Sequence, residues 1–243
     1  MLVEKHDVQG EFLMHQSLGL GLMFLVACGR APSDSQGSGT RTLRVTGAAT
    51  ATPRISNPSS SGDFDTDFSV EVQLTGEVVS TGTVTLTGSG ARTALTFTTN
   101  GGGGHWQGAA SGYDQRYQLD VTSGLEAVTG VIVDGPDIHV ITSPTAGATL
   151  DSALPFTAAW DRAAAADTAR LKAGDGDAVD VPDTGSYVVS ARTLHADKDQ
   201  ARTNTLRITR TNRISPAGAI AGSQFTVGVV NELDVVAAPC PSC

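Results

Sequence analysis

The sequence predicts an all-β protein, built as two tandem β-sandwich domains after a cleaved signal and a disordered linker. Three observations lead to this prediction: a composition rich in Thr, Ser, Ala, Gly and Val, short runs that alternate apolar and polar residues, and regularly spaced turn-forming clusters. Residues of these types favour strands and turns over long helices. Charged residues make up only 17% of the chain, below the roughly 25% typical of soluble domains.

The first expected domain, residues 42–135, contains several alternating apolar runs. The clearest is the run of Phe68, Val70, Val72 and Leu74, which has the period of a half-buried strand. Shorter runs of the same kind are Val84 and Leu86, then Leu95 and Phe97, then Tyr117, Leu119 and Val121. Turn-forming clusters separate them. One of these, a run of four glycines before His105 and Trp106, predicts a hairpin tip with Trp106 packed inward.

The second expected domain, residues 136–238, begins where the pattern restarts. Ile138 and Val140 are expected on one face of its first strand, and the last residues, 239–243, form a tail. Each half spans about 100 residues, the usual size of one sandwich unit. The further expected strands lie near residues 156–160, 187–189, 206–208, 225–230 and 233–236.

The segment Asp161–Lys172 is locally ambiguous. An N-cap candidate, four alanines and a following glycine favour a helix. Alternation of Thr168, Arg170 and Lys172 with apolar neighbours favours a strand. We expect a loop or one helical turn, followed by a strand.

A motif in the second half adds a family resemblance. The run from Asp183 to Val189, DTGSYVV, resembles the D-x-G-x-Y-x-C signature of immunoglobulin domains, with Val189 in the cysteine position. The resemblance implies immunoglobulin-like sandwiches in which Tyr187 forms a corner, its hydroxyl bonding backbone a few residues earlier, and Trp160 is the buried core tryptophan. Without a cysteine pair the core must hold by packing alone, as in fibronectin type III modules.

Residues 1–27 read as a secretory signal. Leu18–Ala27 is an uncharged apolar run of ten residues, too short to cross a bilayer but typical of a signal h-region. The run Leu25-Val26-Ala27-Cys28 resembles the lipobox of bacterial lipoproteins. The n-region departs from that pattern, because Lys5 is its only base against three acids. Initiation at Met14 would remove those acids.

The lipobox resemblance implies that the chain is cut before Cys28 and that this cysteine receives lipid. Residues 28–41 then form a flexible Gly/Ser-rich tether. Gly29 after the cysteine, rather than Asp, implies the outer membrane as the destination under the enterobacterial sorting rule. The expected localisation is therefore the cell envelope, with the membrane contacted through the lipid anchor.

The charge of the chain argues against nucleic-acid binding. The net charge is −9 and no basic stripe is present, whereas nucleic-acid affinity depends on neutralising phosphates. The densest basic run, Arg207, Arg210 and Arg213, is interpreted as a solvated strand and turn. The scattered histidines are expected on the surface or in loops: His105, His139 and His195.

Two acidic clusters are candidates for a weak calcium site, because alternating aspartates gather oxygen ligands. The first candidate is Asp175, Asp177 and Asp180, and the second is Asp63, Asp65 and Asp67. Solvated turns are the alternative interpretation of both clusters. Calcium is the only cofactor that the sequence suggests.

The chain ends Cys240-Pro241-Ser242-Cys243. In an oxidising compartment a local disulfide between Cys240 and Cys243 is expected. It would close only a short terminal loop and so would not hold the fold together.

No catalytic or nucleotide-binding motif occurs in the sequence, and we expect a non-catalytic envelope lipoprotein with a binding or spacer role. The alternative is an accessory module that binds carbohydrate or an envelope protein, and a third reading is a hydrolase with carboxylates on a sandwich face. An exposed row of aromatic side chains would favour sugar binding. A deep cleft with paired carboxylates would favour the enzyme.

Overall fold

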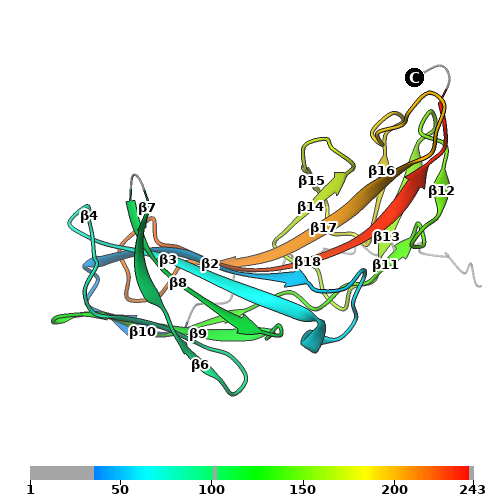
Figure 1. Ribbon diagram of the computed structural model, residues 1–243. Coiled ribbons are helices and arrows are strands. Elements are labelled where there is room, and N and C mark those ends of the chain that lie inside the picture. The colour runs from blue at the N-terminus through cyan, green and yellow to red at the C-terminus, as the bar shows by residue number, and fades with distance from the viewer. Residues whose placement is uncertain (1–35, 101–102, 241–243) are drawn as a thin grey trace, which may run out of the picture. The chain divides into compact units, whose positions relative to one another are not determined.

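A computed structural model describes residues 36–100 and 103–240 and confirms the all-β prediction. Within these residues the chain forms eighteen strands and a single helical element, the 3-10 turn η1 (Ser61–Asp63). The strands make three sheets, which enclose two hydrophobic cores. Figure 1 shows the strand arrangement.

A five-stranded sheet covers one side of the first core. Its strands, in spatial order, are β1 (Ser38–Gly39), β10 (Glu126–Asp134), β9 (Arg116–Ser123), β5 (Thr83–Thr87) and β6 (Arg92–Ala94).

A ten-stranded sheet extends past both cores. Its main path runs β15 (Val179–Val181), β14 (Thr168–Ala173), β17 (Arg202–Ile214), β18 (Gln224–Ala237), β2 (Leu43–Pro53), β3 (Phe64–Leu74), β8 (Gly103–Ser111) and β7 (Thr96–Asn100). Off this path, β12 (Thr149–Leu150) pairs with β18, and β4 (Glu77–Val78) pairs with β3. A three-stranded sheet of β11 (Ile141–Ser143), β13 (Phe156–Trp160) and β16 (Ser186–Val189) contributes to the second core.

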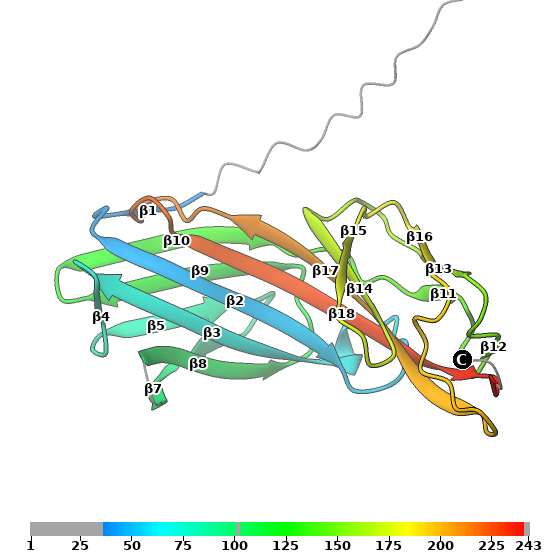
Figure 2. The ribbon, with the colours of Figure 1, turned by 90° about the horizontal axis from the view of Figure 1, so that it is seen from above.

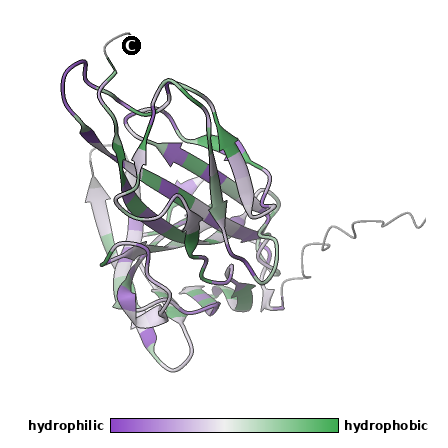
Figure 3. Ribbon diagram, turned by 90° about the vertical axis from the view of Figure 1, so that its right-hand side faces the viewer, coloured by the Kyte–Doolittle hydropathy of each residue, from purple (hydrophilic) through white to green (hydrophobic). Residues whose placement is uncertain are grey.

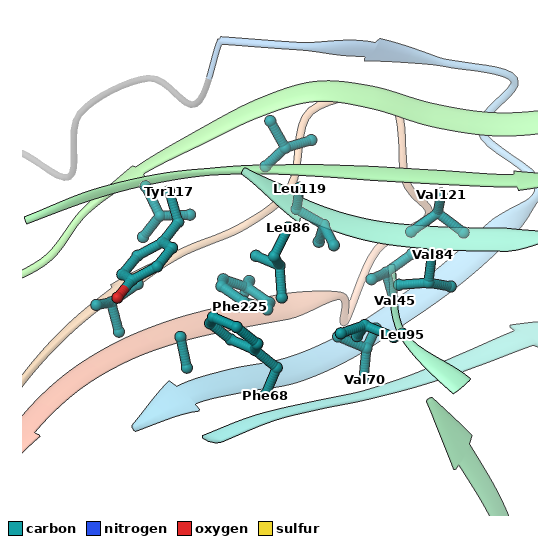
Figure 4. Packing of buried hydrophobic residues seen from close by; sticks show 14 of the residues in the cluster. Val45, Phe68, Val70, Val84, Leu86, Leu95, Tyr117, Leu119, Val121 and Phe225 are labelled. Atoms are coloured by element: carbon teal, nitrogen blue, oxygen red, sulfur yellow. The ribbon is translucent and has the colours of Figure 1, made fainter. Parts of the chain in front are cut away.

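Alternation of apolar residues explains the first core. Along β3 every second side chain is buried, including Phe68 and Val70. Figure 4 shows Phe68 and Phe225 from the ten-stranded sheet facing Leu86 and Leu119 from the five-stranded sheet. The rings of Phe68 and Tyr117 meet edge to face across the core, with centroids 5.7 Å apart, a favourable aromatic geometry.

The hairpin of β17 and β18 belongs to both cores. One end of β18 pairs in parallel with β2, from Gln224 opposite Thr46 to Val229 opposite Ala51. Towards the other end of the hairpin, Leu206 and Leu233 lie in the second core. Figure 2 shows the two strands running along the length of the sheet.

The predicted split into separate domains at residues 135 and 136 is therefore not confirmed. Strands from the end of the chain complete the first core, which contains Ile214, Phe225, Val227 and Val229. The described residues, 36–100 and 103–240, belong to one compact unit. Two hydrophobic cores are present, but the first core contains residues from both sides of the predicted boundary at residue 135.

The tether prediction needs correction at its end. Residues 36–41 lie against the body: Ser38 pairs with Thr129, and the amide of Arg41 donates to the carbonyl of Gly218 at 2.8 Å. These hydrogen bonds satisfy backbone donors and acceptors of the segment. Its Gly/Ser-rich composition does not predict that it pairs with a sheet. Residues 1–35, including the signal segment and Cys28, lie outside the described residues.

Several local predictions are confirmed. Residues 161–167 form a loop and Thr168–Ala173 a strand, so the strand alternative holds over the helix. Strands β7 and β8 make the predicted hairpin, and Trp106 is buried. In Figure 3, hydrophobic and hydrophilic residues alternate along the strands. In the described part of the chain, no helix has the length and apolarity needed to cross a membrane.

Candidate functional site

A hollow of about 690 Å³ lies on the outer face of the ten-stranded sheet, on the side opposite the first core. We call it the sheet groove. Figure 1 shows β4, β7 and β8 near one end of β2 and β3. The groove lies over this part of the sheet. Its lining is Thr46, Gly47, Ala48, Ser69, Glu71, Gln73, Val78, Gly103, Gly104, His105, Gln224 and Thr226.

Strand register arranges the floor of the sheet groove in two cross-strand rows. In the first row, Gln224 lies opposite Thr46 and Thr46 opposite Glu71. These residues belong to three adjacent strands, and each is at least partly exposed. Side chains on neighbouring strands stand about 4.8 Å apart. The row is therefore a ladder of polar side chains on one face.

The second row runs parallel to the first, two residues further along each strand. Thr226 lies opposite Ala48, Ala48 opposite Ser69, and Ser69 opposite Gln107 on β8. The small side chains of Ala48 and Ser69 leave the middle of this row shallow, while the longer side chains of Thr226 and Gln107 project at its two ends.

Several polar side chains of the sheet groove have no hydrogen-bond partner among the described residues. The side chains of Thr46, Ser69, His105 and Gln224 make no hydrogen bond to any described residue. Glu71 is different, because its carboxylate accepts a hydrogen bond from the Gln73 amide. No lysine or arginine is among the described residues that line the groove, and Glu71 is the one carboxylate among them.

A second feature is a buried ion network between the two cores. Arg210 on β17 is fully buried, and its guanidinium reaches carboxylates of Asp183 at 3.0 Å and Asp137 at 3.2 Å. It also donates to the backbone carbonyls of Asp137, at 2.8 Å, and of Ala164. The prediction that Arg210 belongs to a solvated strand is wrong.

The two carboxylates are held by other donors as well. Asp183 accepts the Trp160 indole N–H at 3.0 Å and the Ala166 amide at 2.6 Å. Asp137 accepts the Ala163 amide at 2.7 Å. Burial acts to raise the pKa of Asp137, but the backbone hydrogen bonds and the positive charge of Arg210 outweigh it and hold the pKa below its usual value.

His139 is buried beside this network, so the prediction of a surface or loop histidine is wrong for it. Its Nε2 lies 3.2 Å from the carbonyl oxygen of Ile208, and its Nδ1 has no partner among the described residues. Burial, together with the charge of Arg210, lowers the pKa of His139 to about 4. The neutral ring therefore donates from Nε2. The buried face holds His139 and Ile141, not the expected Ile138 and Val140.

Trp160 lies in the second core, and Tyr187 packs partly buried against it. The Tyr187 hydroxyl has no hydrogen-bond partner in the described chain, so the expected corner is not formed there. The corner geometry occurs in the first half instead. The backbone amide of Asp114 donates to the hydroxyl of Tyr117, three residues later, at 2.9 Å, the arrangement known as a tyrosine corner.

The aspartates of the two acidic clusters do not converge on a common ligand position. In the described residues no group of three or more His, Cys, Asp or Glu side chains is placed to hold a metal ion. In the first cluster Asp175 pairs with His195 at 3.0 Å and Asp180 with Arg170 at 3.1 Å. In the second, Asp65 and Asp67 are exposed along β3. Both sets behave as solvated residues with local partners.

Cys240 is buried and disulfide-bonded. Cys243 lies outside the described residues, so the pairing of these two cysteines stays a prediction.

The discriminating features named above are not found in the described chain. Its exposed large hydrophobic side chains are all aliphatic, so no row of aromatics is present. The sheet groove holds one carboxylate, not a pair. No protein-family model matches the sequence, and the comparison with curated proteins finds no match.

Proposed function

We propose that this protein is a non-catalytic lipoprotein of the cell envelope, cut before Cys28 and anchored by lipid on that cysteine at the outer membrane. The β-sheet body is a rigid scaffold that presents the sheet groove, and the groove is the binding surface. The lipobox-like run Leu25–Cys28 is the basis for the anchor.

One structural observation supports this proposal most. The described residues begin at Gln36, eight residues after Cys28. The residues of both cores lie between Leu43 and Cys240. Cleavage before Cys28 would therefore take nothing from either core. The first described strand, β1, begins at Ser38 and leaves a short Gly/Ser/Pro-containing stretch after the cysteine.

The chemistry of the body favours binding or spacing over catalysis. The two carboxylates closest to a buried cation, Asp137 and Asp183, have their oxygens occupied by Arg210 and by backbone amides. Groups bonded in this way stabilise a fold. They are not free to transfer protons to a ligand, as a general acid or base must do.

Metabolic labelling tests the anchor. Radiolabelled palmitate fed to cells that produce the protein should enter the wild type and the Cys240→Ser variant, but not Cys28→Ser. Cys240→Ser is the matched control, because it also replaces one cysteine by serine yet leaves the lipobox intact. Equal labelling of Cys28→Ser and wild type would refute the lipid site.

A further inference from the structure

We propose that the segment of residues 135–140 is an acid-sensitive strap, which opens when His139 takes up a proton. The strap joins β10, whose apolar residues lie in the first core, to β11, whose Ile141 lies in the second. This inference goes beyond the proposed function, because it depends neither on the lipid anchor nor on the sheet groove.

Side chains from other elements hold the strap in place. Residues 135–140 belong to no strand. Arg210 donates to the backbone carbonyl of Asp137 at 2.8 Å, and the side-chain amide of Asn231 donates to the backbone carbonyl of His139. A segment outside the strand ladders opens at a lower free energy than the core strands around it. We therefore expect the strap to open while both cores stay folded.

The closed strap has a place for only one proton on the imidazole of His139. The ring is fully buried, and its Nε2 lies 3.2 Å from the carbonyl oxygen of Ile208. Its Nδ1 has no hydrogen-bond partner among the described residues. A protonated imidazole carries two N–H donors, so the donor on Nδ1 would be buried without an acceptor. Burial of an unpaired charged group is strongly unfavourable.

The charged and titratable side chains around the ring and the strap come from several elements: Arg210 on β17, Asp183 before β16, Asp137 in the strap, Asp161 after β13 and Tyr113 after β8. Asp183 and Asp137 already pair with Arg210 at 3.0 Å and 3.2 Å. Burial raises the pKa of Tyr113 above its usual value, so its hydroxyl stays neutral. Burial and the charge of Arg210 outweigh the two carboxylates and lower the pKa of His139 to about 4.

The direction of the pH effect follows from the two states of the ring. When the strap is open, the ring is solvated and has the ordinary histidine pKa of 6.5. The open form therefore binds the proton more tightly, and the closed form loses stability as the pH falls from 6.5 to about 4. Within this window each pH unit raises the opening constant by up to about tenfold. Asp137 responds only at lower pH, because its pKa is held below 3.8.

Hydrogen–deuterium exchange of the full-length protein in a non-ionic detergent tests the strap. Protection factors, which correct for the pH dependence of intrinsic exchange, are compared at about pH 7.5 and about pH 4.5. The strap peptide is measured beside a reference peptide from β3. His139→Gln keeps an N–H donor but does not titrate in this range. His105→Gln, the same change at a partly exposed position on β8, is the matched control.

We expect protection of the strap in the wild type and in His105→Gln to be at least about tenfold lower at the acidic pH. In His139→Gln it should be equal at both pH values, and β3 should change by less than about twofold in all three proteins. Unchanged protection of the wild-type strap, or the same loss in His139→Gln, would overturn the inference. An equal loss in β3 would do so as well, because acid would then unfold the whole body.

An NMR titration of the histidine rings in the wild type provides a second test, which holds even if His139→Gln does not fold. The ring of His139 should titrate with a midpoint near pH 4. A midpoint near 6.5 in the folded protein would contradict the strap, because the closed form would then tolerate the proton.

Discussion

At the scale of single residues, Arg210 places a fully buried guanidinium on β17. It follows Leu206 and Ile208 in the alternating phase of β17, and all three side chains are buried. A buried guanidinium is stable only when its hydrogen bonds and charge are compensated. Asp137 and Asp183 provide that compensation from distant parts of the sequence. The alternation of buried residues along this segment could have predicted that Arg210 is buried. The sequence near Arg210 could not have identified its carboxylate partners.

Removing one partner should therefore be costly. Asp183→Ala should reduce the free energy of unfolding by about 3–5 kcal/mol, because it leaves a buried cation partly unpaired. Asp180→Ala is the matched control. The Asp180 side chain is 87% exposed in its pair with Arg170, and loss of an exposed pair costs about 1 kcal/mol or less.

Urea unfolding of the three proteins would measure the difference. Similar losses of unfolding free energy in Asp183→Ala and Asp180→Ala would show that the buried ion network does not stabilise the fold more than an exposed ion pair does.

At the scale of elements, alternation was a good guide and motifs were a poor one. The periodicity of Phe68, Val70 and Val72 identified β3 because burial on one face of a strand imposes period two. The D-x-G-x-Y motif pointed to Tyr187, but the corner forms at Tyr117, which also follows an aspartate, three residues before it. A sequence motif specifies only residue types and their spacing. The hydrogen bond of the corner also depends on the backbone path into the strand that carries the tyrosine.

The two tyrosines allow a direct comparison. Tyr117→Phe removes the hydroxyl that accepts from Asp114 and should reduce the free energy of unfolding by about 1 kcal/mol, since the partly buried amide loses its partner. Tyr187→Phe should cost less than about half of that, because its hydroxyl bonds no described residue. Urea unfolding midpoints again provide the measurement. A larger loss in Tyr187→Phe than in Tyr117→Phe would place the corner back in the second half.

The sheet groove was beyond sequence-based prediction for a related reason. Gln224 and Thr46 are neighbours only because β18 pairs in parallel with β2 across a long sequence separation. Local patterns assign residues to faces of a strand but do not say which strands are adjacent.

At the scale of the whole molecule, the β17–β18 hairpin is the reason that the predicted two-domain split is not confirmed. It contributes Phe225 and Val227 to the first core and Leu206 and Leu233 to the second. The described residues, 36–100 and 103–240, consequently belong to one compact unit, and the proposed N-terminal lipid anchor would carry this unit intact.

The central claim, that this body is anchored through Cys28, is tested most directly by the mass of the mature N-terminus. Trypsin should release a peptide of Cys28-Gly29-Arg30, because Arg30 is the first basic residue after the predicted cleavage site. We expect this peptide to carry a diacylglyceryl group on sulfur and an acyl chain on its α-amine. A mature protein that still contains residues 1–27, or that begins at an unmodified Cys28, would contradict it.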